Sequence, residues 1–358
     1  MARRGLAPAV RALALAGLVL GACGHGAHRH GPPARRAFYY WRTTFSLSEP
    51  ERSALADTGA TRLFVRLFDV DWDADTAGPE TLGPITVPGG PPPPAPPGVE
   101  LVPVVYLRNE LFTRLPADRT ADTAGWVWHA IDDRDAALGL TPHELQLDCD
   151  WTDSTRDRYF AFLDALGAIA RPRGVALSAT IRLHQIKYRE RTGVPPVERG
   201  MLMFYNMGRF SADPDARAIF DPASARAYLG RISSYPLPLD VALPIWSWVV
   251  HLRDEQVVGL MQSTDPDELA GLDFLRPLPD GRWQVTRNAF LHGTLLRQDD
   301  LLKVEETGPD ETLDAARMVW PHLAARGQPR TVALFDLSER NLRRHAVSDL
   351  DHVFRTVR

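Results

Sequence analysis

Short apolar segments recur along the chain, and most are separated by longer segments in which apolar residues follow helical spacing. Their β-branched and aromatic residues predict that the short segments are strands. The expected strands cover residues 37–41, 61–68, 101–107, 144–152, 175–183, 201–205, 241–246 and 331–335. Helices are expected over residues 126–138, 154–171, 222–232, 311–325 and 348–357, and after the cap-like Ser48-Glu49-Pro50.

This alternation predicts an α/β protein with a closed parallel barrel, the (β/α)8 TIM-type barrel with insertions. A doubly wound open sheet is the alternative, but the first strand is not followed by Gly-x-Gly-x-x-Gly, and the sequence contains no phosphate loop. We therefore expect no nucleotide and no cofactor. Residues 78–98, rich in Gly and Pro, are expected to form a surface excursion that is neither strand nor helix interior. Residues 250–330 are expected to hold a less regular insertion, with a hairpin at Asp280-Gly281.

The first residues have the pattern of a targeting segment. A basic start is followed by an uncharged apolar run over residues 12–22, which fits a signal-peptide core and is short for a membrane span. The run ends in Leu20-Gly21-Ala22-Cys23, which resembles the bacterial lipobox. That resemblance implies lipidation at Cys23 and a membrane anchor, and an ordinary secretory signal with a chance cysteine is the alternative.

Three parts are therefore expected: a lipoprotein signal peptide over residues 1–22, a flexible tether over residues 23–36, and one barrel domain over residues 37–358. A lipid anchor predicts a location in the cell envelope, on the periplasmic or outer cell surface. The tether contains three histidines, but its Gly and Pro content favours a polar spacer over a metal site.

The composition of the chain argues against one class of partner and against a disulfide. The net charge of −4 and the absence of a basic stripe interleaved with aromatic residues argue against a nucleic-acid partner. The two cysteines, Cys23 and Cys149, occupy such different contexts that no disulfide is predicted.

The fourth predicted strand carries the clearest chemistry. Side chains alternate along a strand, so Leu145, Leu147 and Cys149 face one way, and Gln146, Asp148 and Asp150 face the other. In such barrels the active site lies at the carboxyl ends of the strands. The residues at those ends include Trp41, Arg42, Asp69, Asp71, Arg108, Asn109, Arg182, His184, Tyr205, Asn206, Trp246, Trp248 and Asp336. This mixture of carboxylates, aromatic rings and polar donors suits a sugar.

We predict Asp148 and Asp150 as catalytic residues, because like charges push the pKa values of neighbouring carboxyl groups apart. The predicted substrate-binding residues are Gln146, Arg182, His184, Tyr205, Asn206, Trp246 and Trp41. Each has a structural alternative: the aspartates as helix caps or arginine partners, Arg182 and His184 as their counter-ions, and the tryptophans as packing residues. A metal site at Asp148, Asp150 and His184 is a further alternative, although no spacing motif enforces it.

Two motifs resemble those of the chitinase-like glycoside hydrolases of family eighteen. Those barrels have Asp-x-Asp-x-Glu on the fourth strand and Met-x-Tyr-Asp on the sixth, and this chain has Asp148-Cys149-Asp150-Trp151-Thr152 and Met203-Phe204-Tyr205-Asn206. The catalytic glutamate of the family falls on Thr152, and its sixth-strand aspartate falls on Asn206. The resemblance implies a glycosidase-like barrel in which the usual proton donor is missing.

Residues 37–340 also resemble a family of bacterial secreted or lipid-anchored proteins known only as a domain of unknown function. The segments that carry this resemblance are FYYW, RLFVRLFDVDW, QLDCDW and RLHQIKYRERTGVPPVERGMLMFYNMG. This family implies the barrel but no activity.

Together, these patterns predict a lipid-anchored, glycosidase-like barrel that hydrolyses or binds a cell-surface or environmental polysaccharide. In the enzyme version, Asp150 is the general acid and Asp148 its electrostatic partner. The alternative is a non-catalytic carbohydrate-binding or envelope-assembly lipoprotein, which Thr152 and Asn206 favour.

Overall fold

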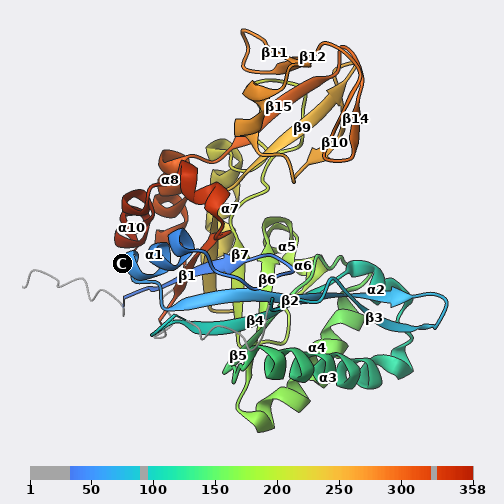
Figure 1. Ribbon diagram of the computed structural model, residues 1–358. Helices are drawn as coiled ribbons and strands as arrows, with labels where there is room; N and C mark the ends of the chain where they lie inside the picture. Colours follow the sequence, from blue (N-terminus) through green and yellow to red (C-terminus); the bar gives the residue numbers. More distant parts are fainter. Residues whose placement is uncertain (1–32, 89–95, 324–328, 358) are drawn as a thin grey trace, which may run out of the picture. The chain divides into compact units, whose positions relative to one another are not determined.

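The computed structural model describes residues 33–88, 96–323 and 329–357. Its central feature is a barrel of parallel strands, shown in Figure 1. The strands are β1 (Arg35–Tyr40), β2 (Arg62–Asp73), β4 (Glu100–Leu107), β5 (Glu144–Asp148), β6 (Ala176–Arg182), β7 (Arg199–Met203), β8 (Leu239–Pro244) and β16 (Thr331–Phe335). Strand β1 pairs in parallel with both β2 and β16, so the sheet closes on itself. The predicted (β/α)8 barrel with insertions is confirmed.

Helices connect the strands, as the amphipathic spacing predicted. The longer ones are α1 (Glu49–Asp57), α3 (Thr120–Leu138), α4 (Arg156–Ala170), α7 (Pro222–Ser233), α8 (Pro309–Val319) and α10 (Val347–Thr356). The sequence patterns missed the short helices α2 (Asn109–Arg114), α5 (Leu183–Lys187), α6 (Arg189–Thr192) and α9 (Glu339–Arg344), which span too few turns for a periodic signal. The short 3-10 helices are η1 (Ala117–Arg119), η2 (Arg171–Arg173), η3 (Pro266–Gly271) and η4 (Trp320–His322).

The alternation along β5 separates two cores. Leu145, Leu147 and Cys149 belong to the apolar layer that the barrel shares with its helices. Gln146 and Asp148 point the other way: the first bonds to Tyr39 inside the barrel, and the second lines a cavity described below. The inner layer is a smaller apolar cluster that includes Tyr39, which stacks on Phe64 with ring centroids 4.9 Å apart.

One expectation for residues 78–98 is wrong. Residues Gly78–Leu82 form strand β3, which pairs antiparallel with the end of β2 and extends β2 as far as Asp73. Proline is tolerated here because β3 is the last strand in the sheet order, so the missing N–H of Pro79 is compatible with an edge position. Residues 89–95 lie outside the described part of the chain.

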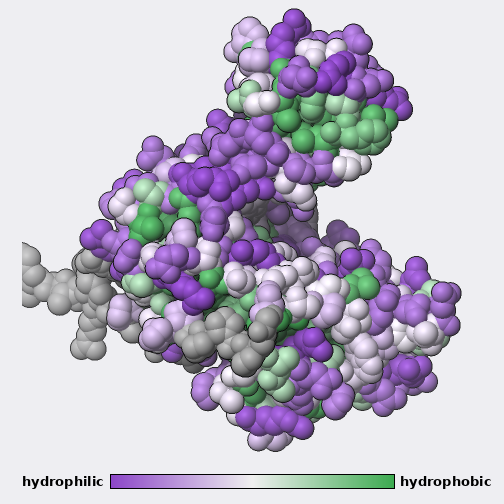
Figure 2. Space-filling view, in the orientation of Figure 1, coloured by the Kyte–Doolittle hydropathy of each residue, from purple (hydrophilic) through white to green (hydrophobic). Residues whose placement is uncertain are grey.

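The insertion between β8 and β16 forms its own antiparallel sheet of β9 (Ser247–Arg253), β10 (Gln256–Met261), β11 (Leu275–Pro277), β12 (Trp283–Val285) and β15 (Leu301–Glu306). A separate hairpin consists of β13 (Ala289–Leu291) and β14 (Thr294–Leu296). The turn at Asp280-Gly281 joins β11 to β12, and Gly281 adopts the left-handed conformation with φ of 82°. Figure 2 shows apolar surface on this insertion, where the exposed large apolar residues are Val257, Val258, Phe290 and Leu295.

The predicted signal peptide and Cys23 lie outside the described residues, which begin at residue 33. Within the described ranges, no helix combines the length and the apolar character that crossing a membrane requires.

Candidate functional site

A cavity of about 600 Å³ lies where the carboxyl ends of the barrel strands meet the insertion. Its aromatic lining consists of Trp41, Tyr106, Tyr205, Trp246, Trp248 and Phe335. Its polar lining consists of Arg42, Asp69, Asp148, Arg182, Asn206, Ser247, Gln262, Asp336, Ser338, Arg340 and Asn341. The cavity therefore lies at the end of the barrel where the sequence placed its candidate residues.

The aromatic residues form a continuous wall. Trp246 meets Tyr205 edge to face, with ring centroids 4.6 Å apart, and lies 5.5 Å from Phe335. Phe335 in turn lies 5.5 Å from Trp41. Because each ring packs on its neighbours, the half-buried Trp41 and Trp246 are held in place and still offer apolar surface to the cavity.

Trp248 joins this wall from the insertion, with its ring centroid 6.0 Å from that of Trp246. Its indole N–H donates to Glu305, which also accepts from the backbone N–H of Ala218 at 3.0 Å. Lys303 pairs with Glu305 at 3.0 Å and donates to the carbonyl of Ala216 at 2.7 Å. The buried Lys303–Glu305 pair thus fastens the loop after β7 to the insertion and positions Trp248 at the cavity.

Asp148 is the buried carboxylate of the cavity. Burial raises its pKa, Arg182 opposes that shift, and the negative charges of Asp150 and Asp69 add to it. Its Oδ1 accepts from the Thr180 hydroxyl at 2.5 Å and from Arg182 at 3.1 Å. The predicted neighbourhood of Asp148 and Arg182 is therefore present in the structure.

Asp150 takes a different position from the one that a proton donor needs. Its side chain is 47% exposed, it is not among the residues that line the cavity, and its Oδ1 accepts from Nε of Arg182 at 2.5 Å. Burial opposes the charge of Arg182, but Asp148 and Asp150 outweigh burial and raise its pKa. Arg182 therefore stays charged and holds both carboxylates, which leaves Asp150 in the role of a counter-ion.

Two tyrosines supply neutral hydroxyl groups. Burial, reinforced by Asp150 and Asp148, raises the pKa of Tyr106 to about 12. Burial also raises the pKa of Tyr205, whose hydroxyl donates to the sulfur of Met203 at 3.0 Å. Both phenols therefore remain protonated at neutral pH. The Tyr106 hydroxyl is able to donate to a ligand, whereas the Tyr205 hydroxyl already donates its proton to Met203.

Asp336, directly after β16, is a third carboxyl group of the cavity. Burial raises its pKa to about 6, while the charge of Arg42 and a hydrogen bond from Asn341 oppose the shift. Nδ2 of Asn341 donates to Oδ1 of Asp336 at 2.6 Å and to its backbone carbonyl at 2.8 Å. The sequence placed Asp336 at the end of the eighth strand and assigned it no role. Its spacing from Asn341, five positions further on, was the one feature of the sequence that could have indicated this pair.

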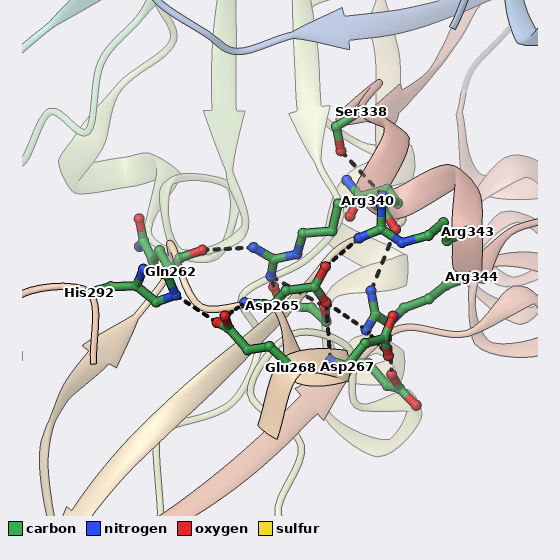
Figure 3. Close-up of polar contacts among 12 residues, drawn as sticks. Gln262, Asp265, Asp267, Glu268, His292, Ser338, Arg340, Arg343 and Arg344 are labelled. Atoms are coloured by element: carbon green, nitrogen blue, oxygen red, sulfur yellow. Dashed lines mark hydrogen bonds and ion pairs between the residues drawn. The ribbon is translucent and has the colours of Figure 1, made fainter. Parts of the chain in front are cut away.

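Helix α9 is fixed to the insertion by a polar junction. Figure 3 shows Arg340, Arg343 and Arg344 directed toward the insertion. Arg343 and Arg344 both pair with Asp265, and Arg340 donates to the carbonyl of Gln262 at 3.0 Å. Because α9 also carries Asn341, this junction holds the group that orients Asp336.

Two predicted substrate-binding residues do not reach the cavity. Gln146 is fully buried and accepts from the hydroxyl of Tyr39 at 2.5 Å, so it supports the barrel interior below the cavity. His184 was expected on the inward face of a strand ending at residue 183, but β6 ends at Arg182 and α5 begins at Leu183. The helical turn leaves the His184 side chain exposed to solvent.

The remaining predicted residues Trp41, Arg182, Tyr205, Asn206 and Trp246 all line the cavity. Cys149 is a buried free thiol on the apolar side of β5, where burial raises its pKa, which is typical of an inert cysteine. The metal alternative at Asp148, Asp150 and His184 gains no support, because the described residues contain no group of three or more His, Cys, Asp or Glu side chains able to hold an ion.

Solved structures share this barrel. The spore cortex-lytic enzyme SleL of Bacillus cereus matches with a TM-score of 0.51 and 12% identity, over 92% of this chain and 75% of that one. A chitinase from Chromobacterium violaceum matches with a TM-score of 0.51 and 11% identity, over 89% and 98%. A GH18 chitinase from Cycas revoluta, in complex with allosamidin, matches with a TM-score of 0.52 and 13% identity, over 90% and 98%.

The chain has a chitinase-like barrel fold. The likeness is in the fold alone, because the identities are so low. No protein-family model matches the chain, and no curated protein does.

Proposed function

We propose that this protein binds a polysaccharide in the cavity at the mouth of its barrel. The observation that carries the proposal is the combination, in one cavity of about 600 Å³, of an aromatic wall with carboxylates and neutral phenols. Trp41 and Trp246 offer flat apolar surface to the faces of sugar rings, and Asp69, Asp148 and Tyr106 offer hydrogen bonds to hydroxyl groups.

The chitinase-like neighbours support an N-acetylglucosamine polymer as a first probe. One Cycas revoluta chitinase structure is a complex with (GlcNAc)3, and the Bacillus cereus neighbour is a spore cortex-lytic enzyme. The binding test is affinity electrophoresis and a glycan array with chito-oligosaccharides, peptidoglycan fragments, β-glucans, xylans and galactans. Retention by at least one of these glycans is expected, and the absence of retention by all of them would contradict the proposal.

Hydrolysis is the second candidate function. It is favoured by the buried Asp148 and the half-buried Asp336, whose pKa values are both raised and which line the same cavity. Release of reducing ends from the glycan that is retained would establish an enzyme. Retention without release would leave a carbohydrate-binding or envelope-assembly protein.

We also propose that Cys23 is lipidated and anchors the protein in the cell envelope, facing away from the cytoplasm. The support is the sequence ending Leu20-Gly21-Ala22-Cys23 after an apolar run. In a bacterial host, wild type is expected in the detergent phase of a Triton X-114 partition, and Cys23→Ser in the aqueous phase. Cys149→Ser is the matched control and should partition like wild type, since its thiol is buried in the barrel wall.

A further inference from the structure

The closed sheet places two carboxyl groups on opposite sides of the cavity. Around the barrel, β6, β7 and β8 lie between β5 and β16 on one side, and β4, β2 and β1 lie between them on the other. Asp148 is the last residue of β5, and Asp336 directly follows β16. Because both line the same cavity, a ligand in the mouth of the barrel lies between them.

The two carboxyl groups have different surroundings. Burial raises the pKa of Asp148, and Arg182 and Thr180, which both donate to its Oδ1, oppose that rise and stabilise its ionised form. At Asp336, Asn341 donates to Oδ1, and no described side chain donates to Oδ2, which is left for the cavity. The positive charges of Arg42, after β1, and Arg340, on α9, act to lower the pKa of Asp336.

We propose that Asp336 is the general acid of this site and that Asp148 is its general base. This proposal rests on the proposed glycan binding and assigns a reaction to the same cavity. It places the proton donor at the end of the eighth barrel strand, opposite the fourth strand where the sequence motif directed attention. Asn341 is then a positioning residue, because it fixes the orientation of the Asp336 carboxyl group.

The reaction is a single displacement at the anomeric carbon. Asp336 gives its proton to the glycosidic oxygen, which keeps the electron pair of the breaking C1–O bond. A water oxygen forms the new bond to C1, and its proton passes to the carboxylate of Asp148. Exchange with solvent then restores both groups, so one water is consumed for each bond cleaved, with inversion at C1.

Titration of Asp336 supports its assignment. A general acid works best when its pKa lies near the working pH, and burial raises the pKa of Asp336 to about 6 despite Arg42. Across the cavity, Asp69 and Asp148 bring negative charge and Arg182 brings positive charge. The acid form of Asp336 is therefore available in mildly acidic solution, and activity is expected to fall above about pH 6.

The test compares Asp336→Asn with wild type on the polysaccharide that wild type retains most tightly in affinity electrophoresis. We expect release of reducing ends to fall at least ~100-fold in Asp336→Asn, since general acid–base catalysis contributes that much, while the dissociation constant changes less than ~3-fold. The 2,4-dinitrophenyl glycoside of the same sugar should lose far less rate than the 4-methylumbelliferyl glycoside, because dinitrophenolate leaves without a proton. Asp135→Asn is the matched control: burial raises the pKa of Asp135 to about 7, but it lies on α3 away from the cavity.

Three results would overturn the assignment: retention of the glycan by wild type without any turnover, Asp336→Asn activity within ~3-fold of wild type, or an equal loss in Asp135→Asn. A substitution that merely unfolds the protein would abolish glycan retention as well, and Asn341→Asp then provides the second variant. It replaces the donating amide by a carboxylate, and it should shift the basic limb of the pH–rate profile upward; an unchanged limb would also contradict the assignment. The failure of wild type to bind any glycan would instead remove the proposed function itself.

Discussion

The two ends of the barrel use the same kinds of residues in opposite ways. At the end where the strands begin, Arg62 binds Glu144 at 2.8 Å and Glu100 at 3.0 Å, and Arg199 binds Asp240 at 2.8 Å. At the end where they finish, Asp336 is held by an uncharged amide and faces a cavity. Pairing at the first end closes the barrel, whereas incomplete pairing at the second leaves polar groups available to a ligand.

Burial alone therefore does not mark a functional residue in this barrel. Arg62 is more deeply buried than Asp336, and yet burial is outweighed by Glu144 and Glu100, which raise the pKa of Arg62. What separates Arg62 from Asp336 is that Arg62 has carboxylate partners, whereas the hydrogen-bond partner of Asp336 is an uncharged amide.

The largest effect is expected from Glu144→Ala at the closed end. The substitution removes a carboxylate from the buried Arg62 and leaves the Ser178 hydroxyl without its acceptor, so the free energy of unfolding should fall by about 3 kcal/mol. Urea denaturation measures it. Asp273→Ala is the control, because its ion pair with Arg287 is exposed and should contribute below about 0.5 kcal/mol. Equal losses in the two variants would mean that the buried ion pairs at the end where the strands begin contribute no more to stability than an exposed pair.

Asp336→Asn should increase the free energy of unfolding, where Glu144→Ala lowers it, and the size of the increase should depend on pH. The pKa of Asp336 is about 6 in the folded state, above the value of about 3.9 in an unfolded chain. The folded protein therefore favours the protonated carboxyl group, and this stabilises the fold at low pH. That contribution is complete below about pH 4 and is lost as the pH rises through 6. At pH 8 the variant should be more stable than wild type by up to about 3 kcal/mol, with little difference at pH 4. Urea denaturation at both pH values decides this, and a variant that is less stable at pH 8 would refute the difference between the ends.

The sequence predicted the barrel because side chains alternate between the two faces of a strand with a period of two residues. Leu145 and Leu147 alternate with Gln146 and Asp148, and the structure places them in the outer and inner layers accordingly. The strand pattern could not locate the point where β6 gives way to α5, and so His184 was assigned to the wrong face.

The sequence patterns also could not predict which polar side chains bind one another at the mouth of the barrel. Arg182 binds Asp148 and Asp150 across neighbouring strands, which removes Asp150 from the cavity. Asn341 reaches back to Asp336 from a helix too short to predict. Such choices depend on side-chain geometry in three dimensions, whereas periodicity specifies only which face a residue occupies.

Trp246→Ala should weaken glycan binding without a comparable loss of stability, since Trp246 offers a half-exposed face to the cavity. Loss of one stacking surface is expected to raise the dissociation constant by about 10-fold, which is about 1.4 kcal/mol. Isothermal titration with the retained glycan measures the change. Trp126→Ala is the control, because Trp126 is 38% exposed on α3 and does not line the cavity. Comparable weakening in both variants would argue against the aromatic wall as the sugar platform.

The smallest effect is expected from Thr152→Glu, which places a glutamate where the family resemblance aligns a catalytic one. Thr152 does not line the cavity, and its hydroxyl lies 2.9 Å from that of Ser154, in the turn that precedes α4. A carboxylate there would meet solvent and the positive end of the helix, so it should remain ionised and donate no proton near neutral pH. Release of reducing ends should therefore stay within about 2-fold of wild type. A rise of 10-fold or more would instead mean that a residue after β5 can donate the proton to the glycosidic oxygen. Asp336 would then line the cavity without being the general acid.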